Sequence, residues 1–286
     1  MLPKPVRRSK LNIWSWMAAI LLPLIIATPL SWFLIPQPII GVIHLNDSIY
    51  SVSAQDMITQ IAYARQHPEI RAVVLVINSP GGTVVDTESV YLELALLRKE
   101  KPVITVVEGM AASGAYYLSV GTDYIFAKPS SIVGNIGIIG ILPTNPTVYE
   151  DYYSTGPYKM TGSTRDTYVR EMEMLKQAFW EAVKLGRGSS LTAPQEVILS
   201  GQIWLGSEAL KIGIIDAIGT QTEAYEKAAE MAKIAHYKVE DLRSLAGLPE
   251  ITSSSFYYQL PDGRITPYPN KEGLYFLYIP PQEAGQ

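Results

Sequence analysis

Apolar runs alternate with amphipathic stretches along most of the chain. Four apolar runs have the length of strands, at 39–45, 72–77, 103–107 and 124–127. The run at 72–77 reads AVVLVI without a polar position, as expected of a strand buried on both faces of a parallel sheet. Six stretches have the pattern of helices, at 53–66, 83–99, 113–120, 166–185, 206–212 and 223–234. Ser53 is the expected N-cap of the first. This alternation predicts an α/β fold.

The first 35 residues follow a different pattern. Residues 11–35 carry no charge, and the run has about the ~20 residues that cross a hydrocarbon core. Basic side chains precede the run and tryptophans flank it: Lys4, Arg7, Arg8, Lys10, Trp14, Trp16 and Trp32. This predicts a cytoplasmic segment 1–10, a transmembrane helix 11–35 and all later residues outside the cytoplasm. A cleavable signal peptide is the alternative, although the run is long and no Ala-x-Ala site follows it.

Composition limits the remaining possibilities. Beyond the predicted anchor about 250 residues remain, enough for one large α/β domain. Without the four N-terminal basic residues there are 19 basic and 27 acidic side chains, a net charge of −8 that argues against nucleic-acid binding. The absence of cysteine excludes disulfides, zinc–thiolate sites and a cysteine nucleophile. No HExxH, P-loop or GxGxxG pattern occurs, so neither a metal nor another cofactor is expected.

A serine among small residues is the first candidate for chemistry. The stretch 108–117 reads EGMAASGAYY, and Ser113 falls between the predicted strand at 103–107 and a helix. N–H groups at a helix start have no internal partners and favour an anion such as a developing oxyanion. The alternative is a packed helix start with a capping serine.

A glycine pair lies about one βα unit earlier. Asn78-Ser-Pro-Gly-Gly82 follows the buried strand and precedes a helix, so its backbone can approach a ligand closely. It is a candidate for a second oxyanion donor, or else an ordinary turn. Because the serine turn follows about one βα unit later, the interpretation as an oxyanion donor is favoured over an ordinary turn.

NSPGG followed by EGMAASGAYYLS resembles the signal peptide peptidase A (SppA) family of membrane-anchored serine peptidases, in the Clp/crotonase superfamily. Three more stretches match in order, at 122–129 (TDYIFAKP), 154–160 (STGPYKM) and 201–216. The resemblance covers about residues 38–235. It implies a Clp/crotonase-like spiral of ββα units over a domain 38–240. By resemblance, Ser113 is the nucleophile, Lys159 the general base, and Gly82 and Gly114 the oxyanion donors.

One position departs from the family pattern. The family reads T-G-S-I-G-V where this chain has IVGNIG at 132–137, so Asn135 replaces a serine that hydrogen-bonds the catalytic lysine. Asparagine can accept a hydrogen bond from an ammonium or donate one to an amine. Asn135 is therefore the candidate that orients Lys159.

The serine hydroxyl needs a base. His44, His67 and His236 are the only histidines, and none lies near a motif. A lysine serves if burial keeps it neutral, and the neighbours of Lys159 are largely uncharged. A Ser-His-Asp enzyme that uses His44 or another histidine stays an alternative.

These features predict a membrane-anchored serine endopeptidase. Its expected substrates are remnant signal peptides or other extended apolar peptides, bound by strand addition along the SPGG edge. The family implies a homo-oligomer, with the dyad formed within or between chains. Two alternatives stay open: a stomatin-operon-partner-type protease that cuts one membrane protein, and a catalytically silent membrane scaffold, to which Asn135 points.

The C-terminal extension, residues 241–286, falls outside the matched region. Aromatic runs at 256–260 and 274–279 flank an Asp262-Gly263 turn and suggest a β-hairpin. Two short strands are not stable alone. We expect them to pack on the domain or on a neighbouring subunit, and we favour the latter because the family forms rings.

Overall fold

The computed structural model describes residues 13–34, 37–142, 154–249, 258–259, 265–266 and 274–277. The chain divides into two compact units, Met1–Gln37 and Pro38–Gln286. The predicted basic segment 1–10 and the Asp262-Gly263 turn lie outside the described residues.

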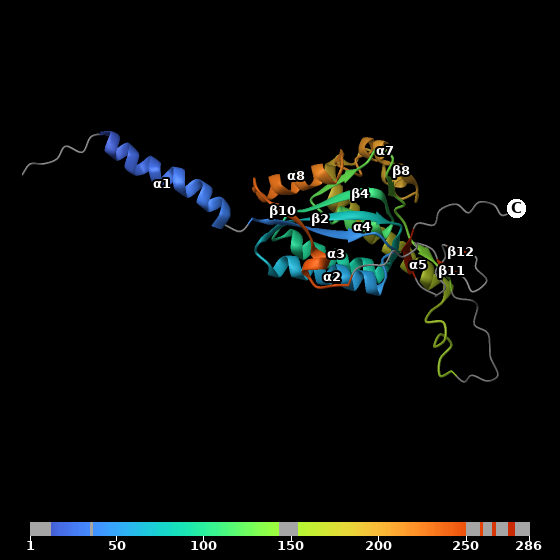
Figure 1. Ribbon diagram of the computed structural model, residues 1–286. Helices are drawn as coiled ribbons and strands as arrows, with labels where there is room; N and C mark the ends of the chain where they lie inside the picture. The colour runs from blue at the N-terminus through green and yellow to red at the C-terminus, as the bar shows by residue number, and fades with distance from the viewer. Residues whose placement is uncertain are drawn as a thin grey trace, which may run out of the picture. The chain divides into compact units, whose positions relative to one another are not determined.

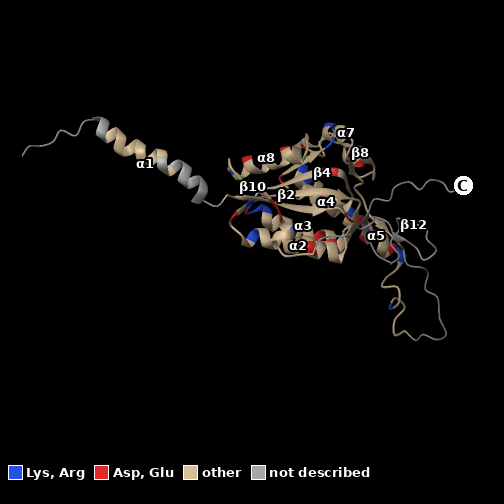
Figure 2. Ribbon diagram, in the orientation of Figure 1, with Lys and Arg blue, Asp and Glu red and all other residues tan. Residues whose placement is uncertain are grey.

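The first unit contains one helix, α1 (Ile13–Leu34). Figure 2 shows no acidic or basic residue on its described part. The side chains described in α1, those of residues 16–25 and 27, are exposed. Within the described residues, no helix is found that is both long enough and apolar enough to cross a membrane.

The second unit holds all other elements. Its helices are α2 (Ser51–Gln66), α3 (Val84–Arg98), α4 (Gly114–Val120), α5 (Arg165–Arg187), the 3₁₀ helix η1 (Gly188–Ser190), α6 (Gln195–Ile198), α7 (Gly206–Lys211), α8 (Gln221–Ala232) and α9 (Leu242–Leu245). Its strands are β1 (Ile39–Leu45), β2 (Ile70–Ser79), β3 (Gly81–Thr83), β4 (Val103–Ala112), β5 (Tyr124–Ala127), β6 (Ile132–Gly134), β7 (Ile139–Gly140), β8 (Ile203–Leu205), β9 (Ala217–Ile218), β10 (Lys238–Asp241), β11 (Tyr258–Gln259), β12 (Ile265–Thr266) and β13 (Leu274–Leu277).

The main sheet is parallel along its length, in the order β10-β1-β2-β4-β5-β9. The short strand β6 pairs with the end of β4, and β8 pairs with β6. The predicted α/β class is confirmed. β1 and β5 coincide with the predicted runs, whereas β2 and β4 continue to Ser79 and Ala112, into the two motif stretches.

Both faces of the sheet are covered. Helices α2 and α3 lie on one face and α8 on the other (Figure 1). Strand β2 shows why its sequence is continuously apolar: Val73, Leu75 and Ile77 enter the core under the first face. The alternate residues Ala72, Val74 and Val76 enter the core under α8. Successive side chains of a strand point to opposite faces of the sheet. Because both faces are buried here, every position of the run 72–77 is apolar.

Helix α2 begins at Ser51, two residues before the predicted start, so Ser53 is not its N-cap. Tyr50 occupies that position, and the Ser53 hydroxyl accepts a hydrogen bond from the Tyr50 N–H at 2.9 Å. The same hydroxyl donates to the carbonyl of Ser48 at 2.8 Å. Ser53 thus closes the turn before the helix from within its first turn.

The C-terminal strands pair differently from the predicted hairpin. β11 pairs with β12, and β13 forms the middle of a separate three-stranded sheet, β3-β13-β7. β13 therefore pairs with its own domain, because β3 and β7 offer it two open edges. β2, β3 and α3 form one ββα unit of the kind that the family resemblance implies.

Candidate active site

Ser113 sits at a sharp corner between β4 and α4. Its backbone has φ 54° and ψ −119°, a conformation that a residue other than glycine seldom adopts. Two backbone hydrogen bonds hold it there: its N–H donates to Gly134 at 2.8 Å, and its carbonyl accepts from Tyr117 at 2.9 Å. Ser113 is only 1% exposed. Strain of this kind, fixed by surrounding structure, gathers at functional sites.

The Ser113 hydroxyl does not cap the helix. Ser113 occupies the N-cap position of α4, but its side chain makes no capping hydrogen bond. The interpretation as a capping serine therefore fails. The hydroxyl therefore lies at the start of α4, where the first N–H groups lack partners within the helix, and is available for another role.

The NSPGG stretch lies directly beside the serine segment. Ser79 on β2 is in register with Ala111 on β4, two residues before the nucleophile candidate. A Cβ atom on Gly109 would lie 2.5 Å from the Oδ1 atom of Asn78, so the two motifs are in contact. The tertiary structure thus unites stretches that the sequence separates by about one βα unit.

Gly82 lies on β3, and its N–H and carbonyl face the edge of the strand that lies away from Ile49. The neighbours on either side of it bond Ile49: the carbonyl of Gly81 accepts from the Ile49 N–H at 2.8 Å, and the Thr83 N–H donates to the Ile49 carbonyl at 2.9 Å. Backbone groups alternate along a strand, so the N–H and carbonyl of Gly82 point away from Ile49. A Cβ atom here would lie 1.9 Å from the Ile49 carbonyl oxygen, so only glycine fits. β3 also lies beside α4, the helix that begins at Gly114.

Asn135 lies next to the serine corner but is bonded to the two residues that precede β8. Its backbone has φ 55°, a left-handed conformation that asparagine tolerates. Its N–H donates to the carbonyl of Gln202 at 2.7 Å, and its side-chain amide donates to the carbonyl of Gly201 at 2.8 Å. The side-chain nitrogen therefore holds the segment that leads into β8. The preceding residue, Gly134, accepts the Ser113 N–H, which links Asn135 to the nucleophile candidate.

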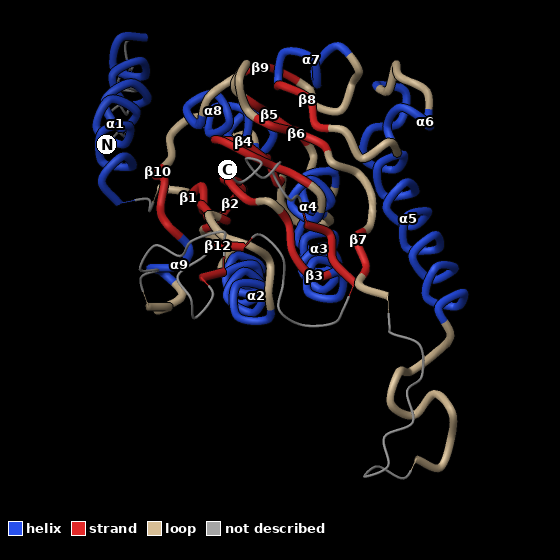
Figure 3. The backbone as a smooth tube through the Cα atoms, turned by 90° about the vertical axis from the view of Figure 1, so that its right-hand side faces the viewer, coloured by secondary structure: helices blue, strands red, loops and turns tan. Residues whose placement is uncertain are grey.

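Lys159 lies on a segment that extends away from the sheet. Figures 1 and 3 show the stretch before α5 leaving the body of the domain. Its hydrogen bonds are local: the Lys159 N–H donates to Gly156 at 3.2 Å, and the Gly162 N–H donates to Tyr158 at 2.6 Å. The Lys159 side chain is exposed. Within one chain, the structure does not bring this segment to the serine corner.

Helix α5 is anchored at only one end. Its buried residues are Phe179, Trp180, Ala182, Val183 and Arg187, whereas residues 165–178 are exposed or half-buried. Arg187 forms a bidentate ion pair with Asp216 at 2.8 and 2.9 Å, and its Nε atom donates to the carbonyl of Gly213 at 3.0 Å. No residue in the amino-terminal half of α5, which follows Lys159, is fully buried.

The histidines lie away from Ser113. His44 on β1 stands opposite Val76, which stands opposite Val106, seven residues before Ser113. Strand geometry puts His44 on the order of 20 Å from the corner. His67 stacks on Tyr63 at the end of α2, and His236 precedes β10 at the amino edge of the sheet. This geometry argues against a Ser-His-Asp triad.

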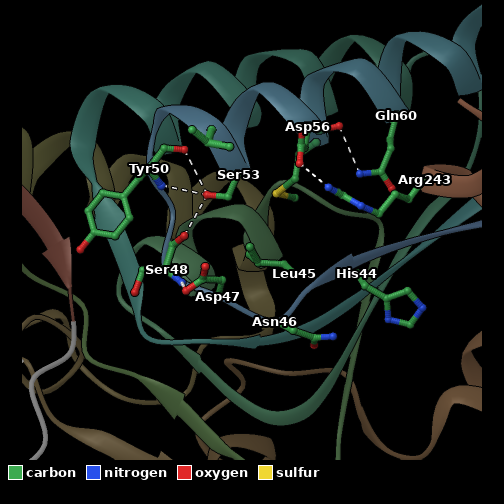
Figure 4. Close-up of a pocket in the computed structure, with 12 residues that line it drawn as sticks. His44, Leu45, Asn46, Asp47, Ser48, Tyr50, Ser53, Asp56, Gln60 and Arg243 are labelled. Atoms are coloured by element: carbon green, nitrogen blue, oxygen red, sulfur yellow. Dashed lines mark hydrogen bonds and ion pairs between the residues drawn. The ribbon is translucent and has the colours of Figure 1, made fainter. Parts of the chain in front are cut away.

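His44 lines a pocket that sequence reasoning did not find (Figure 4). Three of its polar residues pair with one another: Arg243 donates to the Asp56 carboxylate at 2.5 Å, and Gln60 donates to the Asp56 carbonyl at 3.1 Å. The Nε2 atom of His44 lies 3.9 Å from the Asp241 carboxylate. The Arg243–Asp56 pair joins α9 to α2. No group of three or more metal-ligating side chains occurs among the described residues.

Comparison with known proteins agrees with this geometry. The model of the Clp protease family matches residues 39–133, which include Gly82 and Ser113. The model of peptidase family S49 matches residues 95–235, which include Ser113 and Lys159. The two matched regions overlap at residues 95–133, which contain the serine corner. The chain is similar to peptidase family S49 over residues 95–235.

Curated relatives agree with this similarity. The chain is 32% identical to Protease 4 of Salmonella typhi over 221 residues, 70% of this chain and 36% of the relative. It is 36% identical to Protease 4 of Haemophilus influenzae over 182 residues, 59% of this chain and 29% of the relative. It is 28% identical to the chloroplastic serine protease SPPA of Arabidopsis thaliana over 221 residues, 71% of this chain and 33% of the relative. The chain thus spans about a third of the length of these relatives.

Proposed function

We propose that this chain is a serine endopeptidase with a Ser-Lys dyad. The observation that carries the proposal is the strained, buried corner at Ser113, whose hydroxyl does not cap α4. In this mechanism the neutral amine of Lys159 takes the hydroxyl proton as Ser113 attacks the scissile carbonyl. The ammonium then gives that proton to the leaving amine, and water hydrolyses the acyl-enzyme.

Two backbone donors serve the tetrahedral intermediate. The N–H of Gly82 points away from Ile49, and the N–H of Gly114 lies at the start of α4. Both are fixed before the reaction, so they stabilise the developing oxyanion without reorganisation. The contact between β3 and α4 supports their joint action.

We propose that Lys159 reaches a serine of another copy. The segment that carries it extends from the domain, and the following half of α5 exposes apolar side chains, with Val169 45% and Met174 71% exposed. A second copy packed against this half would cover them. Burial in such an interface favours the neutral form of a lysine, as a base requires. The proposed active form is therefore a homo-oligomer.

We propose that α1, which lies within the uncharged run 11–35, anchors the domain. A helix over the 22 residues Ile13–Leu34 is about 33 Å long, close to the ~30 Å of a hydrocarbon core. The basic residues before it favour a cytoplasmic N-terminus and a catalytic domain outside the cytoplasm. Remnant signal peptides and other extended apolar peptides near the membrane are then the accessible substrates.

Peptide hydrolysis by the full chain tests the dyad. We expect Ser113→Ala and Lys159→Ala each to lower the rate by about 10³-fold or more. Lys184→Ala is the matched control, because Lys184 is an exposed lysine on α5 that pairs with Glu181, and the substitution should leave the rate unchanged. Wild-type rates in the two dyad variants would overturn the assignment. A wild-type chain that hydrolyses no peptide would favour a silent scaffold.

A stomatin-operon-partner-type protease would use the same residues. Its substrate range is the difference, since it would cut one membrane protein and leave signal-peptide remnants intact. Assaying both substrate types with the same preparation separates the two activities.

A further inference from the structure

The C-terminal strand fills the gap between two short strands beside the serine corner. β13 pairs antiparallel with β3, with Tyr275 opposite Thr83, Phe276 opposite Gly82 and Leu277 opposite Gly81. On its other edge it pairs antiparallel with β7, with Tyr275 opposite Ile139 and Leu274 opposite Gly140. Figure 3 shows β3 and β7 near α3 and α4, and β13 also lies beside both helices. A chain segment that follows β7 by more than a hundred residues thus completes this small sheet.

The register of β13 places Phe276 opposite Gly82, the proposed oxyanion donor. The Gly81 carbonyl and the Thr83 N–H are bonded to Ile49, so the N–H and carbonyl of Gly82 face the opposite edge of β3. Phe276 stands opposite Gly82 on that edge. In an antiparallel ladder this is the type of pair that exchanges both N–H···O bonds. The Gly82 N–H is therefore directed at the backbone of Phe276 and not at open space.

The same edges suit an extended peptide of any origin. Strand addition takes its affinity from backbone hydrogen bonds, which depend little on sequence. Residues 274–279 read LYFLYI, an uncharged apolar run of the kind proposed for the substrates. A substrate whose scissile carbonyl is to meet the Gly82 N–H must lie where β13 lies.

We propose that Leu274–Leu277 is a built-in ligand of the substrate groove. It occupies the groove between β3 and β7 in the resting chain, and a substrate binds by displacing it. The inference rests on the proposed function, because only that function identifies the groove as the substrate-binding site. It adds an occupant, an antiparallel binding direction and a competition. Because of this competition, the apparent affinity for peptides equals the intrinsic affinity multiplied by the fraction of chains whose groove is open.

Proline at position 276 tests the occupancy in the full chain. Phe276→Pro removes the N–H that faces Gly82 and cannot pair in the middle of a sheet. Phe276→Ala is the matched control, since it shortens the side chain but keeps the backbone groups. The probe is a fluorescent peptide with the sequence of residues 270–281, and its binding is read by polarisation in a Ser113→Ala background so that it is not consumed.

We expect the proline variant to bind the probe at least about tenfold more tightly than the chain with Phe276, corresponding to a groove closed about ten to one. The alanine variant should stay within about twofold of the parent, because its backbone pairing is intact. A chain that ends at residue 257 lacks the tail strands altogether and should bind like the proline variant. Equal affinities for all four chains would overturn the inference.

Hydrolysis by the same variants with Ser113 restored separates the two hypotheses. Faster hydrolysis in the proline variant supports both of them. Tighter binding with no hydrolysis in any chain overturns the peptidase and leaves the built-in ligand standing. Hydrolysis with unchanged rate and affinity overturns the built-in ligand alone.

Discussion

At the scale of single residues, conformation identifies the site more sharply than residue type does. Ser113 and Asn135 both have positive φ without being glycine, and backbone bonds link them through Gly134. Small neighbours around Ser113 could be seen in the sequence, but its φ could not, because it results from contacts with β6. The side-chain bond of Asn135 to Gly201 was likewise hidden, since its partner lies 66 residues away.

Variants at Asn135 separate a structural role from a role toward the lysine. Asn135→Ala loses the bond to Gly201 and puts a less tolerant residue at φ 55°, so we expect it to lower the free energy of unfolding by about 2 kcal/mol. Asn135→Gly loses the bond but accepts the conformation, and should cost about 1 kcal/mol. Urea unfolding measures both.

Peptide hydrolysis then decides the second role. Asn135→Ser, which restores the residue that the family pattern has here, should retain activity, whereas Asn135→Gly should lose activity out of proportion to its stability. Equal activity in both variants would contradict an orienting role of Asn135.

At the scale of elements, the helix that begins at the serine corner is held by a buried tyrosine. Tyr116 on α4 is fully buried, and its hydroxyl donates to the carbonyl of Ile214 at 2.8 Å. Burial raises the pKa of the Tyr116 phenol above its usual value, with Arg187 opposing the shift and Asp216 adding to it. Local signals predicted the central strands β1, β2, β4 and β5 and most of the helices. The Tyr116–Ile214 bond joins residues 98 apart and needed the fold.

The raised pKa of Tyr116 predicts a loss of stability in alkali. The folded chain keeps the phenol proton where the unfolded chain releases it, so the stabilisation is complete below pH about 10 and declines as the pH rises above it. The slope from one group is at most about 1.4 kcal/mol per pH unit. Urea unfolding between pH 8 and pH 11 measures it.

Tyr116→Phe should remove this share of the slope. It should also lower stability at pH 8 by about 1–3 kcal/mol, because the Ile214 carbonyl loses its buried partner. Tyr158→Phe is the control, since Tyr158 is exposed. An unchanged alkaline slope in Tyr116→Phe would show that another group causes the decline.

At the scale of the whole molecule, one chain does not assemble the proposed dyad. The serine corner lies at the carboxyl end of the sheet, while the Lys159 segment and the first half of α5 extend from the domain (Figures 1 and 3). The sequence matched both motifs but gave no distance between them. Their separation within one chain favours pairing between copies over pairing within one.

Mixing two inactive variants tests this pairing. Ser113→Ala and Lys159→Ala chains assembled together at equal amounts should recover about a quarter of the wild-type rate if each site takes serine and lysine from different copies. Ser113→Ala mixed with the double variant contains no serine and serves as the control. A mixture as inactive as this control would mean that each dyad forms within one chain.

The sequence by itself determined the α/β class, the central strands and the two motifs around the nucleophile candidate, because apolar periodicity and small-residue turns are local signals. Tertiary structure decided that the tail strand pairs with β3 and β7 and not with β11, because the partner of a strand is set by which edges the fold leaves open. Tertiary structure also decided that Lys159 is separated from Ser113 within one chain, because the direction of α5 follows from the ion pair that joins Arg187 to Asp216. The pairing of β13 and the direction of α5 both depend on contacts between residues far apart in the chain. A local sequence pattern carries no information about such contacts.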